Sequence, residues 1–290
     1  MKPEKTMKNC IILMIALVFI NNNIYSQERV SLNVIYEFSY VRDLAARDNP
    51  YKTNMVLSLG KSTSRYCTEK LYNNKTKKDI EKNVSRQSTA PKPTVVVAGG
   101  PLLIINKYGA IINEEVIKDI ANEKMNLYAS MGFKTYSIDE ELPKIDWKIQ
   151  PDKKVIGNYN CQKATGTFGG RVYTVWFAPD LAFRDGPWKL SGLPGLILEA
   201  QDQKKEISFV YKGISRNTDN EEKTASFLIN DGCIKTNIKS YLKTKEAFEK
   251  DPETIMSAMA PNAKLAVRNL DDPEDKTAKK IKNYNPLESY

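Results

Sequence analysis

The sequence of 290 residues contains no histidine. This absence excludes Ser-His-Asp and Cys-His nucleophile arrangements, HExxH metalloprotease motifs and histidine proton shuttles. Two phosphate-binding signatures are missing as well, because no GxxxxGK(S/T) loop and no GxGxxG turn occur. Since the commonest catalytic motifs are absent, we predict a protein that is not an enzyme and that binds no cofactor.

Cysteine is scarce, with only Cys10, Cys67, Cys161 and Cys233. These spacings are too wide for a zinc site, and no metal site is predicted. Disulfides persist in exported proteins, and three of the four cysteines lie beyond the N-terminal segment described next. Two alternatives stay open: one disulfide, for which Cys67–Cys161 is the choice, or buried, inert thiols.

One uninterrupted apolar run marks the N-terminus. Residues 10–20, CIILMIALVFI, follow three lysines. This length is typical of the apolar segment of a signal peptide, whereas a bilayer span needs about 20 residues. We predict a signal peptide over residues 1–26, a mature chain starting at Gln27, and no transmembrane segment after cleavage. The mature protein is therefore expected in an exported compartment.

Acidic residues are in the minority, with 35 Asp and Glu against 44 Lys and Arg and a formal net charge of +9. Removing residues 1–26 leaves +7. The basic residues are scattered among acidic ones, and no arginine-rich arm or nucleic-acid motif occurs. The pattern indicates a solvated basic surface and no nucleic-acid partner.

Strand signals dominate the sequence. Residues 30–41 and 51–59 alternate apolar and polar side chains, as half-buried strands do. Residues 153–168 and 171–179 are rich in β-branched and aromatic residues and flank Gly169-Gly170, which predicts a hairpin. The returning strand is apolar on both faces, so we expect it to be covered on both.

Three helices are also predicted, the last of them a short one that begins at Asp251-Pro252-Glu253. Asn113, followed by Glu114 and Glu115, has the signals of a helix start. A second helix follows from an apolar stripe formed by Ile238, Tyr241, Leu242 and Phe248. The predicted fold is α+β but mainly β: an antiparallel, curved, half-barrel-like sheet with a few helices on one side. We expect a single domain over residues 27–260 and a loosely ordered tail over residues 261–290.

The segment Gly186–Ala200 reads GPWKLSGLPGLILEA. Prolines fix φ, and glycines permit positive φ or close backbone approach, so a rigid loop that leads into a strand is predicted. The residues assigned to this structural role are Gly186, Pro187, Gly192, Pro194 and Gly195. The apolar side chains of the loop either close one end of the core or line a groove.

The GLPGLIL sequence at Gly192–Leu198 resembles the signature of the GLPGLI family of exported proteins. Its context fits as well, with Cys161, Lys163-Ala164, the VWFAP strand and GPWKLS preceding the signature. The similarity is specific over about residues 145–215. It implies a protein of the Gram-negative envelope, in the periplasm or on the outer surface, without an established biochemical activity.

Two functions are considered. The first is a non-catalytic envelope protein that cradles an apolar or lipid-like ligand, with Trp176, Trp188, Leu193 and Leu196 lining the cavity. The second is a protein-interaction or assembly accessory of an outer-membrane system, with the GLPGLI loop as a rigid element and Trp188 and Arg184 as partner contacts. An enzyme is a third possibility, which requires a cleft that gathers two carboxylates or a carboxylate and a lysine.

Overall fold

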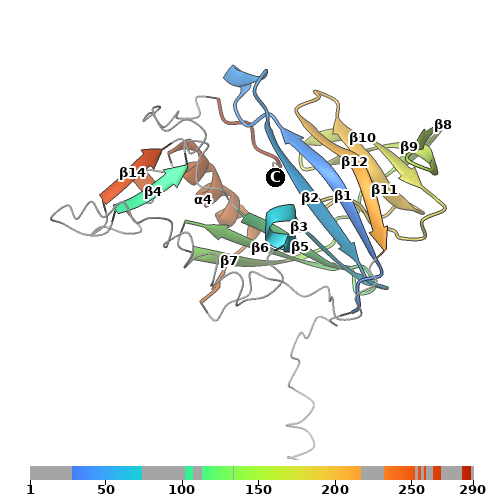
Figure 1. Cartoon of the computed structure of the whole chain (residues 1–290), viewed down its shortest axis with the longest axis horizontal. Helices are drawn as coiled ribbons and strands as arrows, with labels where there is room; N and C mark the ends of the chain where they lie inside the picture. The colour runs from blue at the N-terminus through green and yellow to red at the C-terminus, as the bar shows by residue number, and fades with distance from the viewer. Residues whose placement is uncertain are drawn as a thin grey trace, which may run out of the picture.

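The computed structural model describes residues 28–73, 102–106, 113–132, 134–216, 232–251, 254–255, 258, 264–268 and 283–288. About half of these residues belong to one sheet of twelve strands (Figure 1). The strands are β1 (Leu32–Tyr40), β2 (Tyr51–Leu59), β3 (Thr63–Thr68), β5 (Asn113–Asp119), β6 (Lys124–Met131), β7 (Lys134–Glu141), β8 (Lys148–Ile156), β9 (Tyr159–Phe168), β10 (Arg171–Ala178), β11 (Leu196–Asp202), β12 (Ile207–Arg216) and β13 (Ile234–Lys235).

The strand order in this sheet is β13-β7-β6-β5-β3-β2-β1-β12-β11-β10-β9-β8. All neighbouring pairs are antiparallel except β13 and β7, which run parallel. A separate parallel pair joins β14 (Lys264–Arg268) to β4 (Leu102–Asn106). The described residues also include the helical elements η1 (Leu44–Ala46), α2 (Glu69–Asn73) and α4 (Ile238–Lys250).

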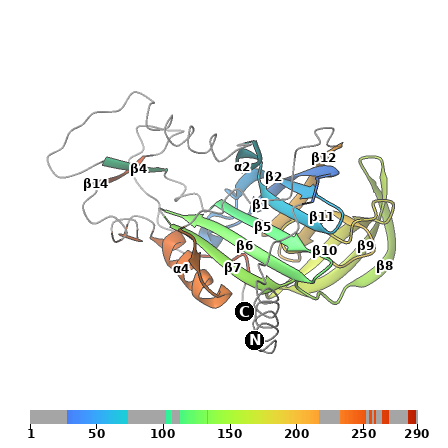
Figure 2. The same ribbon diagram turned by 90° about the horizontal axis from the view of Figure 1, so that it is seen from below.

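The large sheet is curved, with β5–β7 and β8–β10 towards its two ends and α4 beside β7 (Figures 1 and 2). This confirms the predicted fold class, α+β but mainly β, with an antiparallel, unclosed sheet. The predicted C-terminal helix is α4, whose N-cap Asn237 accepts a hydrogen bond from Ser240 N. Its apolar residues Tyr241 and Phe248 are buried, as the stripe predicted.

Strand alternation places the core on the inner side of the curve. Val34, Tyr36 and Phe38 on β1 are buried, and they pair in register with β2 and β12. The predicted hairpin is confirmed as β9–β10, and Gly169 and Gly170 both have positive φ in its turn. Glycine adopts these angles without the steric cost that a Cβ atom brings.

The helix predicted from Asn113 is wrong, because this segment forms the antiparallel strands β5 and β6. β5 lies between β3 and β6 inside the sheet. Glu115, Val116, Ile117 and Lys118 are all buried, so neither face of β5 is exposed to water there. A strand buried on both faces loses its alternation, and its apolar residues can then imitate a helical stripe.

No disulfide joins Cys67 to Cys161, and both side chains are buried thiols. The two residues lie on β3 and β9, with five strands between them in the sheet. A disulfide needs Cα atoms within about 7 Å, whereas adjacent strands alone are about 5 Å apart. The alternative of buried thiols therefore holds for these two residues.

The predicted signal peptide, residues 1–26, lies outside the described residues. The predicted loose tail, residues 261–290, is described in part, and it includes strand β14 and a packed segment at 283–288. Asn285, Leu287 and Glu288 are buried, and Tyr284 forms an antiparallel bridge with Asp43. Residues 283–288 therefore differ from that prediction. Among the helices of the described residues, none is long and apolar enough to cross a membrane.

Candidate functional site

The GLPGLI loop, residues 185–197, is largely buried against the large sheet. It contacts strands that are distant in the sheet order: Lys118 of β5 donates to Asp185, Tyr36 of β1 donates to Ile197 O, and Lys189 donates to Glu140 of β7. Trp188 is only 4% exposed, and Leu190, Leu193 and Leu196 are fully buried. The loop thus supplies the core with side chains that the strands alone do not provide.

Two glycines of the loop lie against other atoms. A Cβ atom on Gly186 would lie 2.7 Å from Cβ of Ile197, and one on Gly195 would lie 2.4 Å from the carbonyl oxygen of Ala178. Gly192 has a φ of 99°. A Cβ atom on this residue would have only the Trp147 ring within 4 Å, at 3.8 Å. Gly186 is therefore required by packing, Gly192 by backbone conformation, and Gly195 by both.

Buried charges fix the loop. The Nζ atom of Lys118 donates to Gly186 O at 2.7 Å as well as to Asp185, and both side chains are buried. Lys189 Nζ lies 2.8 Å from Oε1 of Glu288 and 3.2 Å from Oε2 of Glu140. Sequence reasoning missed both lysines as core residues. The only signal was the position of Lys189 between Trp188 and Leu190 in an apolar stretch.

The residues predicted to line an apolar cavity do not do so together. Trp188, Leu193 and Leu196 belong to the hydrophobic core. Trp176 points to the opposite face of β10 from the buried Val175 and Phe177, as strand alternation requires. The structure therefore places Trp188, Leu193 and Leu196 in the core and Trp176 in a half-buried position next to it.

Trp176 is half-buried, with Nζ of Lys154 4.6 Å from its ring centroid. The same Nζ atom lies 2.5 Å from Glu199 Oε2. Of the two residues predicted to contact a partner, Arg184 is exposed and Trp188 is buried. Within residues 185–197, only Gly192 and Pro194 are exposed.

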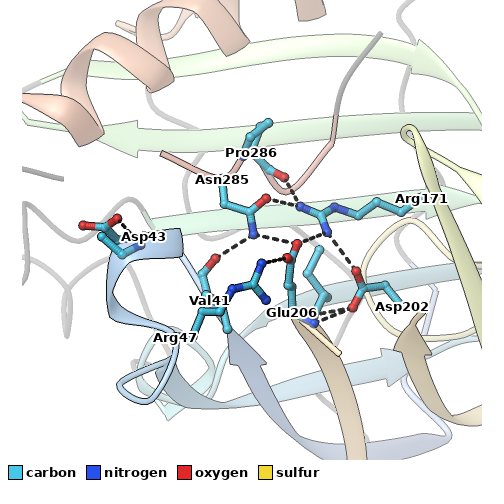
Figure 3. Close-up of polar contacts among 10 residues, drawn as sticks. Val41, Asp43, Arg47, Arg171, Asp202, Glu206, Asn285 and Pro286 are labelled. Atoms are coloured by element: carbon cyan, nitrogen blue, oxygen red, sulfur yellow. Dashed lines mark hydrogen bonds and ion pairs between the residues drawn. The ribbon is translucent and has the colours of Figure 1, made fainter. Parts of the chain in front are cut away.

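The polar network around Arg171 joins three parts of the fold (Figure 3). Arg171 donates to Asp202 Oδ2 at 2.8 Å, to Glu206 Oε2 at 2.9 Å, to Asn285 Oδ1 at 2.6 Å and to Pro286 O at 2.7 Å. Burial alone would raise the pKa of Glu206, but hydrogen bonds from Arg171, Arg47 and Asn285 lower it overall. The hydrogen bonds of Arg171 hold the β11–β12 turn and residues 283–288 against β10.

A cleft of about 300 Å³ lies between α4 and residues 284–288; we name it the α4 cleft. The residues that line it are Lys239, Leu242, Lys243, Lys245, Glu246, Tyr284, Pro286, Leu287 and Glu288. It is formed by segments that are distant in sequence, and its lining combines apolar side chains with ionisable ones. The third possibility, an enzyme, required such a combination of carboxylates and lysine.

Lys245, which lines the α4 cleft, and the two ionisable groups that contact it or its partner are not suited to proton transfer at neutral pH. Lys245 Nζ lies 2.5 Å from Glu114 Oε1, and Tyr241 also donates to this oxygen. Burial favours the neutral forms, but the pairing lowers the pKa of Glu114 and raises that of Lys245. Burial, reinforced by the charge of Glu114, raises the pKa of Tyr241 well above its ordinary value. All three groups therefore keep one protonation state around pH 7.

In the part of the chain that the structure describes, no group of three or more Cys, Asp or Glu side chains is placed to hold a metal ion.

The β8 edge, defined as strand Lys148–Ile156, is the last strand of the large sheet and pairs with β9 alone among the described strands. Its side chains include Val155, 66% exposed, and Ile149, 48% exposed. Lys148 and Lys153 are also exposed, and neither forms an ion pair with a described residue. A register irregularity separates the two paired ends of β8, between Ile149 and Lys153. The edge is therefore apolar and basic.

Comparison with models of known protein families finds no match, and comparison with curated protein sequences finds none either. Among solved structures, a structure of PNGF-II in space group P21 is 14% identical, with a TM-score of 0.49 over 73% of this chain. A structure of PNGF-II in space group C2 has a TM-score of 0.45 over 74% of this chain. The chain spans 32% of the length of PNGF-II in both cases. Similarities at this level imply nothing about function.

Proposed function

We propose that this protein is a non-catalytic interaction protein that binds an extended polypeptide segment along the β8 edge. The observation that carries the proposal is the exposure of Val155 and Ile149 on a strand with one unpaired side among the described strands. An unpaired strand edge offers a row of backbone donors and acceptors, which an added strand can satisfy.

The charge of the β8 edge indicates which side chains the proposed partner carries. Lys148 and Lys153 are exposed on the β8 edge without an ion partner among the described residues. Lysines on an edge strand disfavour pairing between two copies of that edge, because like charges then meet. The same lysines favour a partner strand with acidic side chains. The proposed partner is therefore an extended segment with alternating apolar and acidic residues.

The compartment belongs to the same proposal. The apolar run at residues 10–20 and the GLPGLIL signature support export to a Gram-negative envelope and membership of the GLPGLI family. An interaction protein of an outer-membrane system would meet its partners there. N-terminal sequencing of the protein from its native cells tests the export step, with Gln27 expected as the first residue.

Site-specific photocrosslinking in the native cells tests the interaction. A crosslinking residue at position 155 should give a discrete adduct, and Lys148→Glu/Lys153→Glu should abolish it. The matched control is position 210, since Val210 is also exposed but lies on β12 within the sheet. Equal adducts from positions 155 and 210, or none from 155, would contradict the proposed role of the edge.

A further inference from the structure

The α4 cleft has the dimensions of a small-molecule site. Its volume of about 300 Å³ is at the lower end for ligand pockets and corresponds to roughly ten water-sized groups. The apolar part of its lining comes from Leu242 on α4 and from Tyr284, Pro286 and Leu287 on the facing segment. An occupant thus needs a short apolar body.

The charges around the α4 cleft are paired except for two. Lys245 is paired with Glu114, Glu288 with Lys189, and Glu246 with Lys250. Lys239 and Lys243 are exposed, line the cleft and form no ion pair with any described residue. Because they are four residues apart on α4, the two ammonium groups lie on the same helix face. The cleft therefore has an excess of positive charge next to an apolar lining.

We propose that the α4 cleft binds a small anionic amphiphile, a carboxylate on a short alkyl or aryl body. The carboxylate lies between Lys239 and Lys243, and the apolar body packs on Leu242 and Leu287. This site is distinct from the β8 edge, which is a separate strand and shares no lining residue with the cleft. The ligand proposed for the α4 cleft is a small molecule, whereas the partner proposed for the β8 edge is a polypeptide.

Isothermal titration of the full mature chain with sodium octanoate, below its micelle concentration, tests the proposal. We expect one site per chain, and Lys239→Gln/Lys243→Gln should weaken binding about tenfold, since each exposed ion pair is worth up to about a factor of five. The matched control is Lys124→Gln/Lys204→Gln, which removes the same charge from exposed lysines outside the cleft lining and should leave the affinity unchanged.

A chain-length series separates a built site from counter-ion attraction. From butanoate to octanoate, each methylene should tighten binding, by up to about fourfold. Octylammonium should bind much more weakly than octanoate. An affinity independent of chain length, or equal binding of octylammonium, would overturn the proposal.

A third arm distinguishes a free ligand from a lipid surface. Vesicles of phosphatidylglycerol present anionic groups without a free monomer. Vesicle binding that is lost in the Lys239→Gln/Lys243→Gln variant, together with no binding of octanoate, would replace the proposed ligand with a membrane surface. Octanoate binding that both double variants weaken equally would also refute the assigned site. Neither result bears on crosslinking at position 155, so the two proposals can fail independently.

Discussion

The Nζ atom of Lys189 lies 2.8 Å from Oε1 and 2.9 Å from Oε2 of Glu288, and both side chains are buried. Lys189 belongs to the GLPGLI loop, and Glu288 belongs to the C-terminal segment that forms one wall of the α4 cleft. The pair spans 99 residues of sequence. The pair therefore links the packing of the GLPGLI loop to the position of residues 284–288 at the α4 cleft.

Breaking this pair should be costly. Lys189→Met leaves Glu288 buried without its cation, and we expect a loss of about 3–5 kcal/mol in the free energy of unfolding. The double variant Lys189→Met/Glu288→Leu should recover most of this loss, because it removes both charges. Urea unfolding of the three proteins measures the effect. A double variant as unstable as Lys189→Met would show that the unpaired charge of Glu288 does not cause the loss of stability.

Gly195 and Gly192 form a matched test of packing against backbone conformation. Gly195→Ala places a Cβ atom 2.4 Å from Ala178 O, at a φ of 154°, whereas Gly192→Ala adds only the strain of a φ of 99°. We expect about 1–2 kcal/mol of destabilisation for Gly192→Ala and a clearly larger value for Gly195→Ala. Thermal unfolding compares the two variants, and equal shifts in Tm would contradict the packing argument.

The Glu114–Lys245 pair predicts acid sensitivity. Burial would raise the pKa of Glu114, but Lys245 and Tyr241 lower it below the ordinary value of 4.5. A carboxyl group whose pKa is lower in the folded state than in the unfolded state stabilises the fold at pH values above the unfolded-state pKa. This stabilisation is lost as the pH falls through the folded-state pKa. Stability should therefore decline below about pH 4.5, and Glu114→Gln should be less stable at neutral pH with a flatter decline. Unfolding free energies from pH 3 to 7 measure both slopes, and parallel slopes would refute the assignment.

Thiol reactivity tests whether Cys67 and Cys161 are buried thiols and not a disulfide. Burial raises the pKa of Cys161 to about 11, so its thiolate is scarce at pH 8. Cys67 is buried as well, whereas Cys233 is partly exposed. Iodoacetamide should label Cys233 in the native protein and label Cys67 and Cys161 only after unfolding. Mass spectrometry identifies the labelled peptides, and a disulfide-linked Cys67–Cys161 peptide would contradict the structure.

The alternation in residues 30–41, the Gly169-Gly170 turn and the stripe of α4 were sufficient to predict a mainly β protein with its β9–β10 hairpin and the helix α4. These features are local, because side-chain direction in a strand or helix follows the period of the backbone. The same local reasoning was wrong for Asn113–Met131, where burial of both strand faces removes the period.

The position of the apolar side chains of the GLPGLI loop could be decided only by the tertiary structure. The sequence determined a rigid loop, through its prolines and glycines, but left open whether Trp188 and Leu193 close the core or line a groove. Only the curvature of the sheet decided this, because it brings β1, β5 and β7 around the loop. The α4 cleft likewise depends on the distant pairs Lys189–Glu288 and Lys245–Glu114, and no local pattern indicates which charges will meet.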